Sequence, residues 1–230
     1  MGLDPLVSGP DRGIAVRAMF DRIAPRYDLV NRLMTFGLDV RWRRRAVQSL
    51  GLPSASLVLD VACGTGDLCR DLHRAGYRAI GVDVSAGMLG AAHEGVPLVQ
   101  GDGLALPLPD AVADGITCGF ALRNVVDIGA LFGEFARVLR PGGRLAILEI
   151  AEPRSRALRS AHGFYFRRVV PLIGGLVSDR AAYRYLPASA RLLPASEDLA
   201  TLLAGRSCTD VRVDSVALGA VQLVTGTRDH

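Results

Sequence analysis

Apolar residues between about positions 57 and 150 alternate between two kinds of pattern. Short runs of β-branched and aliphatic residues indicate strands at 57–61, 78–82, 97–100, 114–119 and 144–150. Between these runs, apolar positions at helical spacing indicate helices at 67–75, 85–92 and 128–139. Strands that alternate with helices favour a parallel sheet with right-handed crossovers, so the pattern predicts an α/β fold.

The segments on either side of this region have different patterns. Helical spacing from 16 to 50, broken near Ala24-Pro25, predicts a helical cap ahead of the sheet. Residues 151–200 are rich in arginine and aromatic residues and predict a helical insertion that covers the site. Two β-rich segments, 209–217 and 220–227, could form a terminal antiparallel hairpin. We expect residues 1–12 to be loose and the whole of 1–230 to form one domain.

Composition narrows the class of protein only a little. Half of the residues are apolar, and the net charge of +4 arises from 27 basic residues, all of them arginine, against 23 acidic ones. The arginines form no basic stripe, so we expect no nucleic-acid partner. The four cysteines form no C-x-x-C pair and no metal-ligand spacing is present, which favours a reducing cytoplasm and no metal. The longest apolar run, 169–177, is too short to span a bilayer.

The first predicted strand ends in a two-glycine turn, Gly64-Thr65-Gly66, that leads into a helix. Glycines let a ligand approach the backbone, and the start of a helix presents unpaired N–H groups. A dinucleotide fingerprint needs a third glycine where this chain has Cys69. The acids Asp60 and Asp67 at the margins of the loop disfavour a pyrophosphate. They favour the ammonium and sulfonium groups of S-adenosylmethionine (SAM).

Acids that follow two later strands support the same cofactor. Asp83 ends the second predicted strand seventeen residues after Gly66, where a carboxylate can take two ribose hydroxyls. Asp102 follows the third strand and is suited to an adenine amino group. Both acids could also cap the helices that follow. We therefore expect SAM to bind at Asp60, the two glycines, Asp83 and Asp102.

A polar pair, Arg123-Asn124, lies in an apolar stretch after the fourth predicted strand. Ligands of open α/β sheets bind at this carboxyl-terminal edge, which makes the pair a candidate for contact with a second substrate. Arg123 could instead form an i,i+4 pair with Asp127.

The only tryptophan, Trp42, stands among four arginines near the end of the predicted cap. Two interpretations stay open. The helix has solvated arginines and a core tryptophan, or it presents a face to anionic lipid or to a long apolar substrate.

Several further motifs resemble one family. They are Phe20-Asp21, Ala24-x-x-Tyr27-Asp28-x-x-Asn31, Trp42-Arg43, Asp60-Val61-Ala62-x-Gly64-Thr65-Gly66-Asp67, Leu122-Arg123-Asn124, Arg137-Val138-Leu139-Arg140-Pro141-Gly142-Gly143 and Tyr183-x-Tyr185-Leu186-x-x-Ser189. Over about residues 18–226 the chain resembles the ubiquinone/menaquinone biosynthesis C-methyltransferases. These SAM-dependent enzymes methylate a ring carbon of a polyprenylated quinol. The resemblance implies a Rossmann-like class I methyltransferase fold, with a seven-stranded, mostly parallel sheet whose last strand is antiparallel.

The resemblance also assigns roles to residues. By matching position, SAM contacts fall on Thr65, Asp83, Asp102, Gly103 and Gly119. Arg123 is expected to stabilise a phenolate as it forms, because a guanidinium stays charged and cannot ordinarily act as the base. Asn124 is expected to orient the acceptor.

Further groups are candidates for the lid or the acceptor site. They are Tyr27, Asp28 and Tyr183. No histidine is a convincing base, since His73 and His93 fall on outer predicted helices and His230 is terminal. His162, in the predicted insertion, stays a candidate.

The expected reaction is methylation of demethylmenaquinol to menaquinol. The benzoquinol step of ubiquinone biosynthesis, or methylation of another aromatic molecule, is the alternative, because the family's terminal Gly-Gly-x-x-Ala-Leu-His pattern is replaced here at 218–224. A nicotinamide oxidoreductase and a non-catalytic SAM-binding relative are competing classes. We expect a cytoplasmic protein that contacts the inner face of the cell membrane, and a homodimer is a further possibility.

Overall fold

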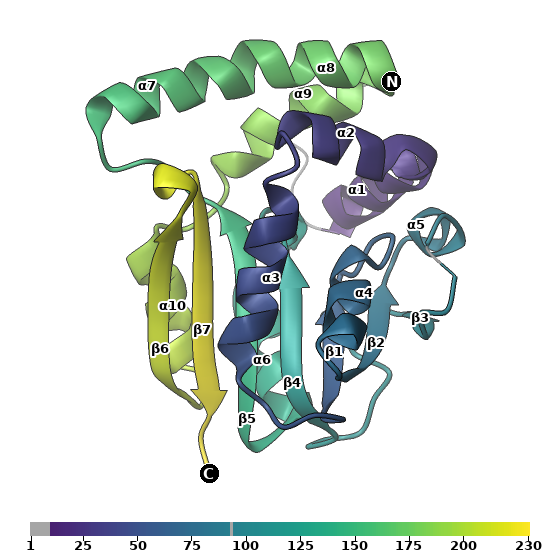
Figure 1. Ribbon diagram of the computed structural model, residues 1–230, viewed down its shortest axis with the longest axis vertical. Coiled ribbons are helices and arrows are strands. Elements are labelled where there is room, and N and C mark those ends of the chain that lie inside the picture. Colours follow the sequence, from purple (N-terminus) through teal and green to yellow (C-terminus); the bar gives the residue numbers. More distant parts are fainter. Residues whose placement is uncertain (1–9, 93) are drawn as a thin grey trace.

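A computed structural model describes residues 10–92 and 94–230 (Figure 1). The first nine residues of the stretch expected to be loose, and His93, lie outside the described residues. The described chain forms a seven-stranded sheet in the order β3-β2-β1-β4-β5-β7-β6. Neighbouring strands are parallel except where β7 pairs with β5 and with β6. The predicted α/β fold, with a mostly parallel sheet and an antiparallel last strand, is confirmed.

The strands lie close to their predicted positions. They are β1 (Leu57–Val61), β2 (Arg78–Asp83), β3 (Leu98–Gln100), β4 (Ala113–Gly119), β5 (Leu139–Ile150), β6 (Cys208–Val216) and β7 (Val221–Arg228). Strand β5 begins five residues earlier than predicted, because the expected turn at 140–143 bulges out of the strand. Ala113 pairs with Leu139 and Gly115 with Arg144, so the intervening residues are accommodated by Gly142 at φ 76°.

Two layers of helices cover the sheet. One face packs on α3 (Asp39–Leu50) and α4 (Asp67–Arg74), and the other on α6 (Ile128–Val138) and α10 (Ser196–Ala204). Alternate residues of β5 serve the two layers: Ile147 joins the core under α6 and α10, whereas Leu148 joins the core under α3 and α4. Burying each such side chain contributes about 1.5–3 kcal/mol, so the two cores hold the strand ends in fixed positions.

The remaining helices lie over the carboxyl-terminal edge of the sheet. They are α1 (Pro10–Ile23), a 3-10 turn (Ala24–Arg26), α2 (Tyr27–Met34), α5 (Ala86–Gly90), α7 (Arg156–Phe164), a π-helical segment (Tyr165–Val169), α8 (Val170–Val177) and α9 (Arg180–Ala190). Figure 1 shows α7 and α8 running as one long helix across the top of the molecule, above α2. A third core, which includes Met19, Val30, Val170 and Tyr183, joins the N-terminal helices α1 and α2 to α8 and α9. The Tyr165 hydroxyl also donates to the Met34 carbonyl over 2.6 Å.

Candidate active site

Two neighbouring cavities lie between the sheet edge and the helices above it. The sheet-edge cavity, about 530 Å³, lies where β1, β2 and β4 end, and the lid cavity, about 370 Å³, lies beneath α2, α8 and α9. Both volumes are in the usual range for small-molecule sites. The cavities share lining residues, among them Phe20, Tyr27, Gly64, Gly119, Phe120 and Asn124. Two ligands bound in these cavities would therefore lie next to each other at the lining that the cavities share.

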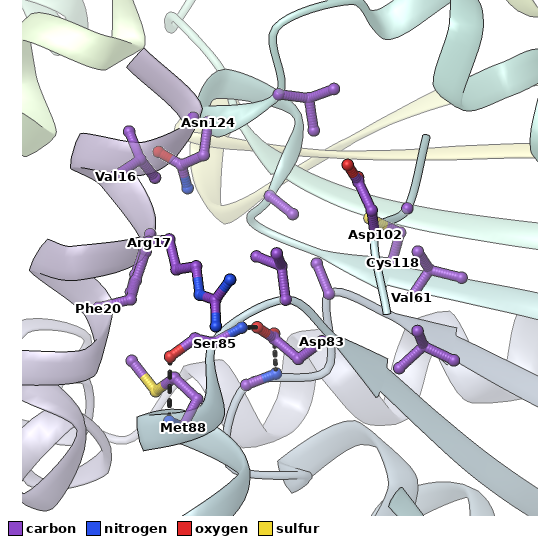
Figure 2. Close-up of a pocket in the computed structure, with 18 of the residues that line it drawn as sticks. Val16, Arg17, Phe20, Val61, Asp83, Ser85, Met88, Asp102, Cys118 and Asn124 are labelled. Carbon is purple, nitrogen blue, oxygen red and sulfur yellow. Dashed lines mark hydrogen bonds between the residues drawn. The ribbon is translucent and has the colours of Figure 1, made fainter. Parts of the chain in front are cut away.

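Asp83 lies in one wall of the sheet-edge cavity (Figure 2). Its carboxylate accepts hydrogen bonds from the backbone N–H groups of Gly64 (2.7 Å) and Ser85 (2.8 Å), and burial raises its pKa. A carboxylate has about four lone-pair positions, so these two bonds leave room for hydroxyl donors of a ligand. The N-cap of α5 is Ser85, whose hydroxyl accepts from the Met88 N–H. The side chain of Asp83 therefore points to the cavity and is not the helix cap.

The opposite wall of this cavity comes from α1. Figure 2 shows Val16, Arg17 and Phe20 facing Asp83 and Asp102 across the space. Asp102 accepts from the Leu104 N–H over 2.9 Å, which fixes the turn after β3.

The backbone turns sharply at the wall that the two cavities share. Gly64 takes φ +55°, and a Cβ on Gly119 would approach the Leu68 side chain to 2.8 Å. Ala62 and Phe120, which directly follow β1 and β4, also have positive φ angles of 57°. Positive φ costs a non-glycine residue about 1 kcal/mol or more and is concentrated at functional sites. The sequence pattern did not reveal these two residues, because neither is a residue type that marks strain.

The residues predicted to bind SAM divide between the two cavities. Gly64, Asp83, Asp102, Gly103 and Gly119 line the sheet-edge cavity. Asp60 and Thr65 line the lid cavity instead, and Gly66 lines neither. Gly66 precedes α4 with φ 81°, so its role in the structure is to start that helix.

The two acids at the margins of the glycine loop have different surroundings. Asp60 is buried, accepts from the Thr117 hydroxyl (2.8 Å) and the Cys69 thiol (3.5 Å), and burial raises its pKa to about 7. Asp67 forms ion pairs with Arg43 at 3.0 Å and with Arg70. These ion pairs balance the charge of Asp67 inside the protein. Asp67 also lines the lid cavity, and its attraction for a ligand cation stays a prediction.

Arg123 and Asn124 lie on a 3-10 turn (Leu122–Asn124) and both line the lid cavity. Arg123 is paired with Glu149, with 2.6 Å between Nη1 and Oε1. The alternative pairing with Asp127 is wrong: the turn ends at Asn124, and Asp127 accepts from the Ala130 N–H as the N-cap of α6. Glu149 was missed, although an acid within an otherwise aliphatic strand is a signal that the sequence carries.

Two polar atoms on this turn are buried without a hydrogen-bond partner in the described structure. They are Arg123 Nε, a donor, and Asn124 Oδ1, an acceptor. A buried polar group without a partner costs about 1–3 kcal/mol, so such groups are expected to bond to a ligand. The hydroxyl of an aromatic acceptor can accept from the first atom and donate to the second.

The other acceptor-site candidates surround the same cavity. Asp28 accepts from the Thr65 hydroxyl over 2.6 Å, and Tyr27 lies at the wall shared by the two cavities. Burial raises the pKa of Tyr27 and of Tyr183. His162 packs against Phe166 with ring centroids 4.5 Å apart and the ring planes tilted by 48°, and burial lowers its pKa. Tyr183 and His162 also line the lid cavity, so the structure brings all four candidates together.

Two interpretations of the arginine-rich helix α3 were open: solvated arginines with a core tryptophan, or a face for anionic lipid or a long apolar substrate. The structure has features of both. Arg41, Arg44 and Arg45 are exposed, but Arg43 is buried between Asp39 (2.5 Å), Asp67 (3.0 Å) and Asp71 (2.9 Å). The expectation that all of these arginines are solvated is therefore wrong. Trp42 lines the lid cavity and packs on Phe120, with ring centroids 6.3 Å apart.

Comparisons with known proteins agree with this geometry. The model of the ubiE/COQ5 methyltransferase family matches residues 8–228. The ubiquinone/menaquinone biosynthesis C-methyltransferase UbiE of Geobacter sulfurreducens is 40% identical, over 95% of this chain and 90% of its own length. The demethylmenaquinone methyltransferase of Roseiflexus sp. is 43% identical over 93% of each chain, and that of Thermus thermophilus 42% over 91% of this chain and all of its own.

Solved structures show the same fold at much lower identity. A SAM-dependent methyltransferase from Thermotoga maritima, described as a possible histamine N-methyltransferase, has a TM-score of 0.68 at 22% identity, over 93% of this chain and 100% of its own. A Haemonchus contortus phosphoethanolamine N-methyltransferase in complex with SAM has a TM-score of 0.61 at 13% identity, over 83% and 53%.

Proposed function

Because this chain belongs to the ubiE/COQ5 methyltransferase family, we propose that it transfers a methyl group from SAM to a ring carbon of a polyprenylated quinol, converting demethylmenaquinol to menaquinol. The observation that carries the proposal is the pair of adjoining cavities that meet at Tyr27, Gly119 and Asn124. The sheet-edge cavity has Asp83 and Asp102 in its lining, and the lid cavity has Arg123 among the apolar and aromatic residues of the helices above it. The benzoquinol step is the second candidate, since some relatives are named for both pathways. The whole chain acts as one domain, with 16–50 as cap and 151–200 as insertion.

The residues of the sheet-edge cavity fit SAM. Asp83 would take the ribose hydroxyls and Asp102 the adenine amino group, while Gly64, Gly103 and Gly119 leave the backbone open to close approach. When bound, SAM supplies an electrophilic methyl group on a positively charged sulfur. Asp60 and Thr65 line the neighbouring lid cavity and would support the glycine loop from that side.

The residues of the lid cavity fit a quinol. Arg123 would stabilise the phenolate that forms on the acceptor, and Asn124 would orient the acceptor hydroxyl before it loses its proton, by accepting from it at Oδ1. This stabilisation grows as negative charge develops, so it favours the transition state over the ground state. Because their pKa values are raised, Tyr27 and Tyr183 stay protonated and act as donors. Asp28 and His162 line the same cavity and are the candidates to accept the proton.

The tail of the quinol has an apolar route out of the lid cavity. Phe36 lines the cavity and is 77% exposed, so it marks the mouth. Nearby on the long α7–α8 helix, Phe164, Leu172 and Leu176 are 62%, 60% and 78% exposed. No helix of the described residues has the length and hydropathy that a bilayer crossing requires. We propose that this face docks on the surface of an anionic membrane, with the exposed Arg167 and other arginines at the headgroups.

The same proposal predicts the compartment in which the protein works. The protein would work in the cytoplasm at the inner face of the cell membrane, where a polyprenylated quinol resides. The expected homodimer stays a prediction, to be tested by sedimentation.

Incubation of the purified protein with SAM and reduced demethylmenaquinone, followed by mass spectrometry of the quinone, tests the function. Arg123→Met should lower turnover by about 10²–10³-fold, the scale of losing one preorganised donor. Arg123→Lys keeps the charge without the planar fork and should lose less, with SAM affinity nearly unchanged in this variant. Arg140→Met is the control, because Arg140 pairs with Asp114 away from both cavities.

Two outcomes would overturn the proposal. One is a protein that binds SAM but methylates neither the naphthoquinol nor the benzoquinol. The other is wild-type turnover in both Arg123 variants. Competition between the two quinols decides between the two candidate functions.

A further inference from the structure

Glu149 is a fully buried acid next to the proposed acceptor site. It is the penultimate residue of β5 and has 0% exposure. Its carboxylate accepts from Arg123 Nη1 over 2.6 Å, from the Ile150 N–H over 2.9 Å and from the Arg123 N–H over 3.3 Å. Glu149 therefore holds both the side chain and the backbone of Arg123.

Glu149 has one cation beside it in the part of the chain that the structure describes. Within the described residues, Arg123 is its one partner at ion-pair distance. On β7, Gln222 lies directly opposite in the strand register, is buried and donates to the Ile150 carbonyl over 3.3 Å. A buried ion pair gives up the hydration of both charges and contributes little to stability compared with apolar residues of the same size. A role beyond stability would account for its position.

The pair determines how Arg123 faces the lid cavity. Nη1 is directed away from the cavity to Glu149, which does not line it, whereas Arg123 itself does. Nε is buried without a partner in the described structure. A second arginine reinforces the turn, since Arg12 Nη2 donates to the Arg123 carbonyl. The guanidinium is thus fixed at one end, and its remaining donors are left for the acceptor.

Charge gives the pair a second consequence. A lone arginine in the lid cavity, next in sequence to Asn124 at the wall shared with the SAM cavity, would repel the positively charged sulfur of SAM. The Glu149 carboxylate on the far side of the guanidinium makes the pair neutral overall. The donors of Arg123 can then stand beside a cationic ligand and still stabilise a developing phenolate.

We propose that Glu149 is a positioning residue for methyl transfer: its buried carboxylate fixes the Arg123 guanidinium at the lid cavity and balances its charge beside SAM. The inference rests on the proposed function, because the effect on turnover is exerted through the role of Arg123 on the quinol. The balance of charge concerns SAM alone and is measured without the quinol.

Turnover variants test the positioning. Glu149→Asp keeps the charge but withdraws the carboxylate by one methylene, and should lower kcat by about 10–10²-fold with little change in the KM for the quinol, because a misplacement of about 1 Å has effects of this size. In an Arg123→Met background, a further Glu149→Gln substitution should change kcat by less than about twofold, since the group that Glu149 positions is gone. The matched control is Asp114→Asn. Asp114 also accepts from an arginine (Arg140) and from a backbone N–H (Leu57), but at the opposite edge of the sheet.

SAM binding tests the balance of charge. Glu149→Gln leaves Arg123 unneutralised and should raise the Kd for SAM, measured by calorimetry, by about tenfold or more, the scale expected of one unbalanced charge at a few ångströms. The Arg123→Met/Glu149→Gln double variant should recover the wild-type Kd. Asp114→Asn should lower the Tm but leave both kcat and the Kd for SAM unchanged.

The wild-type protein offers a measurement that needs no Glu149 variant to fold. In a nuclear magnetic resonance spectrum the guanidinium protons of Arg123, assigned by their loss in Arg123→Lys, should appear as separate signals because Nη1 is held by Glu149. One averaged signal would overturn the proposal. So would wild-type kcat in Glu149→Asp, or losses that multiply in the double variant. If the wild type methylates no quinol, the proposed function fails, but the resonance and SAM measurements still decide the role of Glu149.

Discussion

The hydroxyl of Thr65 donates to the carboxylate of Asp28 over 2.6 Å and so connects the glycine loop after β1 to the first turn of α2. Thr65 is buried, and both residues line the lid cavity. Thr65→Val keeps the shape and removes the donor, which should lower the free energy of unfolding by about 1.5–3 kcal/mol, the range for a hydrogen bond to a charged group. Urea titration measures this change.

The same variant should also weaken SAM binding, because the loop that Thr65 anchors holds Gly64 at the cofactor cavity. Thr65→Ser is the control, since it keeps the hydroxyl. Equal stability of the Val and Ser variants would show that the contact between loop and cap contributes nothing.

Asp83 provides a direct test of the cofactor site. Asp83→Ala removes the carboxylate that faces the cavity and should weaken SAM binding by about 1–3 kcal/mol, because two ribose hydroxyls would lose their acceptor. Calorimetry with SAM gives the dissociation constant. Asp110→Ala is a suitable control, because Asp110 is exposed and pairs with Arg137. An unchanged dissociation constant in the Asp83 variant would remove this residue from the site.

The positions of Asp83 and Asp102 could be predicted from sequence because a simple rule places them. Parallel strands end at the same edge of a sheet, so acids that follow successive strands are close in space without knowledge of the packing. The polar pair Arg123-Asn124 was located at the sheet edge in the same way. The alternation of strands and helices predicted a parallel sheet, but not the order of its strands.

Contacts between distant segments could not be predicted in this way. The partner of Arg123 is Glu149, on the neighbouring strand, whereas local spacing suggested Asp127. Arg43 looked like a solvated arginine in a helix, but the approach of α4 surrounds it with acids. Ala62 and Phe120 carry positive φ angles that local preferences disfavour, and only the tertiary structure imposes them.

The lid cavity predicts a dependence on the length of the prenyl chain. Each CH₂ group buried beneath the helices contributes about 0.8 kcal/mol, so longer-chain quinols should have lower KM values until the covered length is exceeded. Phe36→Ser, at the mouth, should reduce this dependence and leave KM for a quinol without a prenyl chain unchanged. Steady-state kinetics with quinols of graded length provide the measurement. Equal KM values for short and long chains would mean that the helices do not shelter the tail.

Vesicle binding tests the proposed membrane face. The protein should co-sediment with vesicles that contain phosphatidylglycerol, and Leu176→Asp should weaken binding at least tenfold, because it places a charge where 78% of an apolar side chain is exposed. Leu202→Asp is the matched control, as Leu202 is an exposed apolar residue of α10, away from α7 and α8. Equal effects of the two substitutions would argue against a specific docking face.

Asp60 predicts how stability changes with pH. Burial raises its pKa from 3.8 to about 7 in the folded protein, whereas the unfolded chain releases the proton near the ordinary value. Between these two values the folded state holds more protons than the unfolded state, so this residue lowers the free energy of unfolding as pH rises. Below about pH 4 both states are protonated and above about pH 7 both are charged, so the dependence is confined to that interval.

Asp60→Asn isolates this contribution, because the carboxamide has the same size, stays neutral and can still accept from the Thr117 hydroxyl. The variant should become more stable relative to wild type as pH increases from about 4 to about 7, with a difference of at most about 4 kcal/mol that then levels off. Urea titrations of both proteins at several pH values give this difference. A difference that does not change with pH would mean that the Asp60 carboxyl is already ionised in the folded protein at acidic pH, so that contacts with its charged form outweigh the effect of burial.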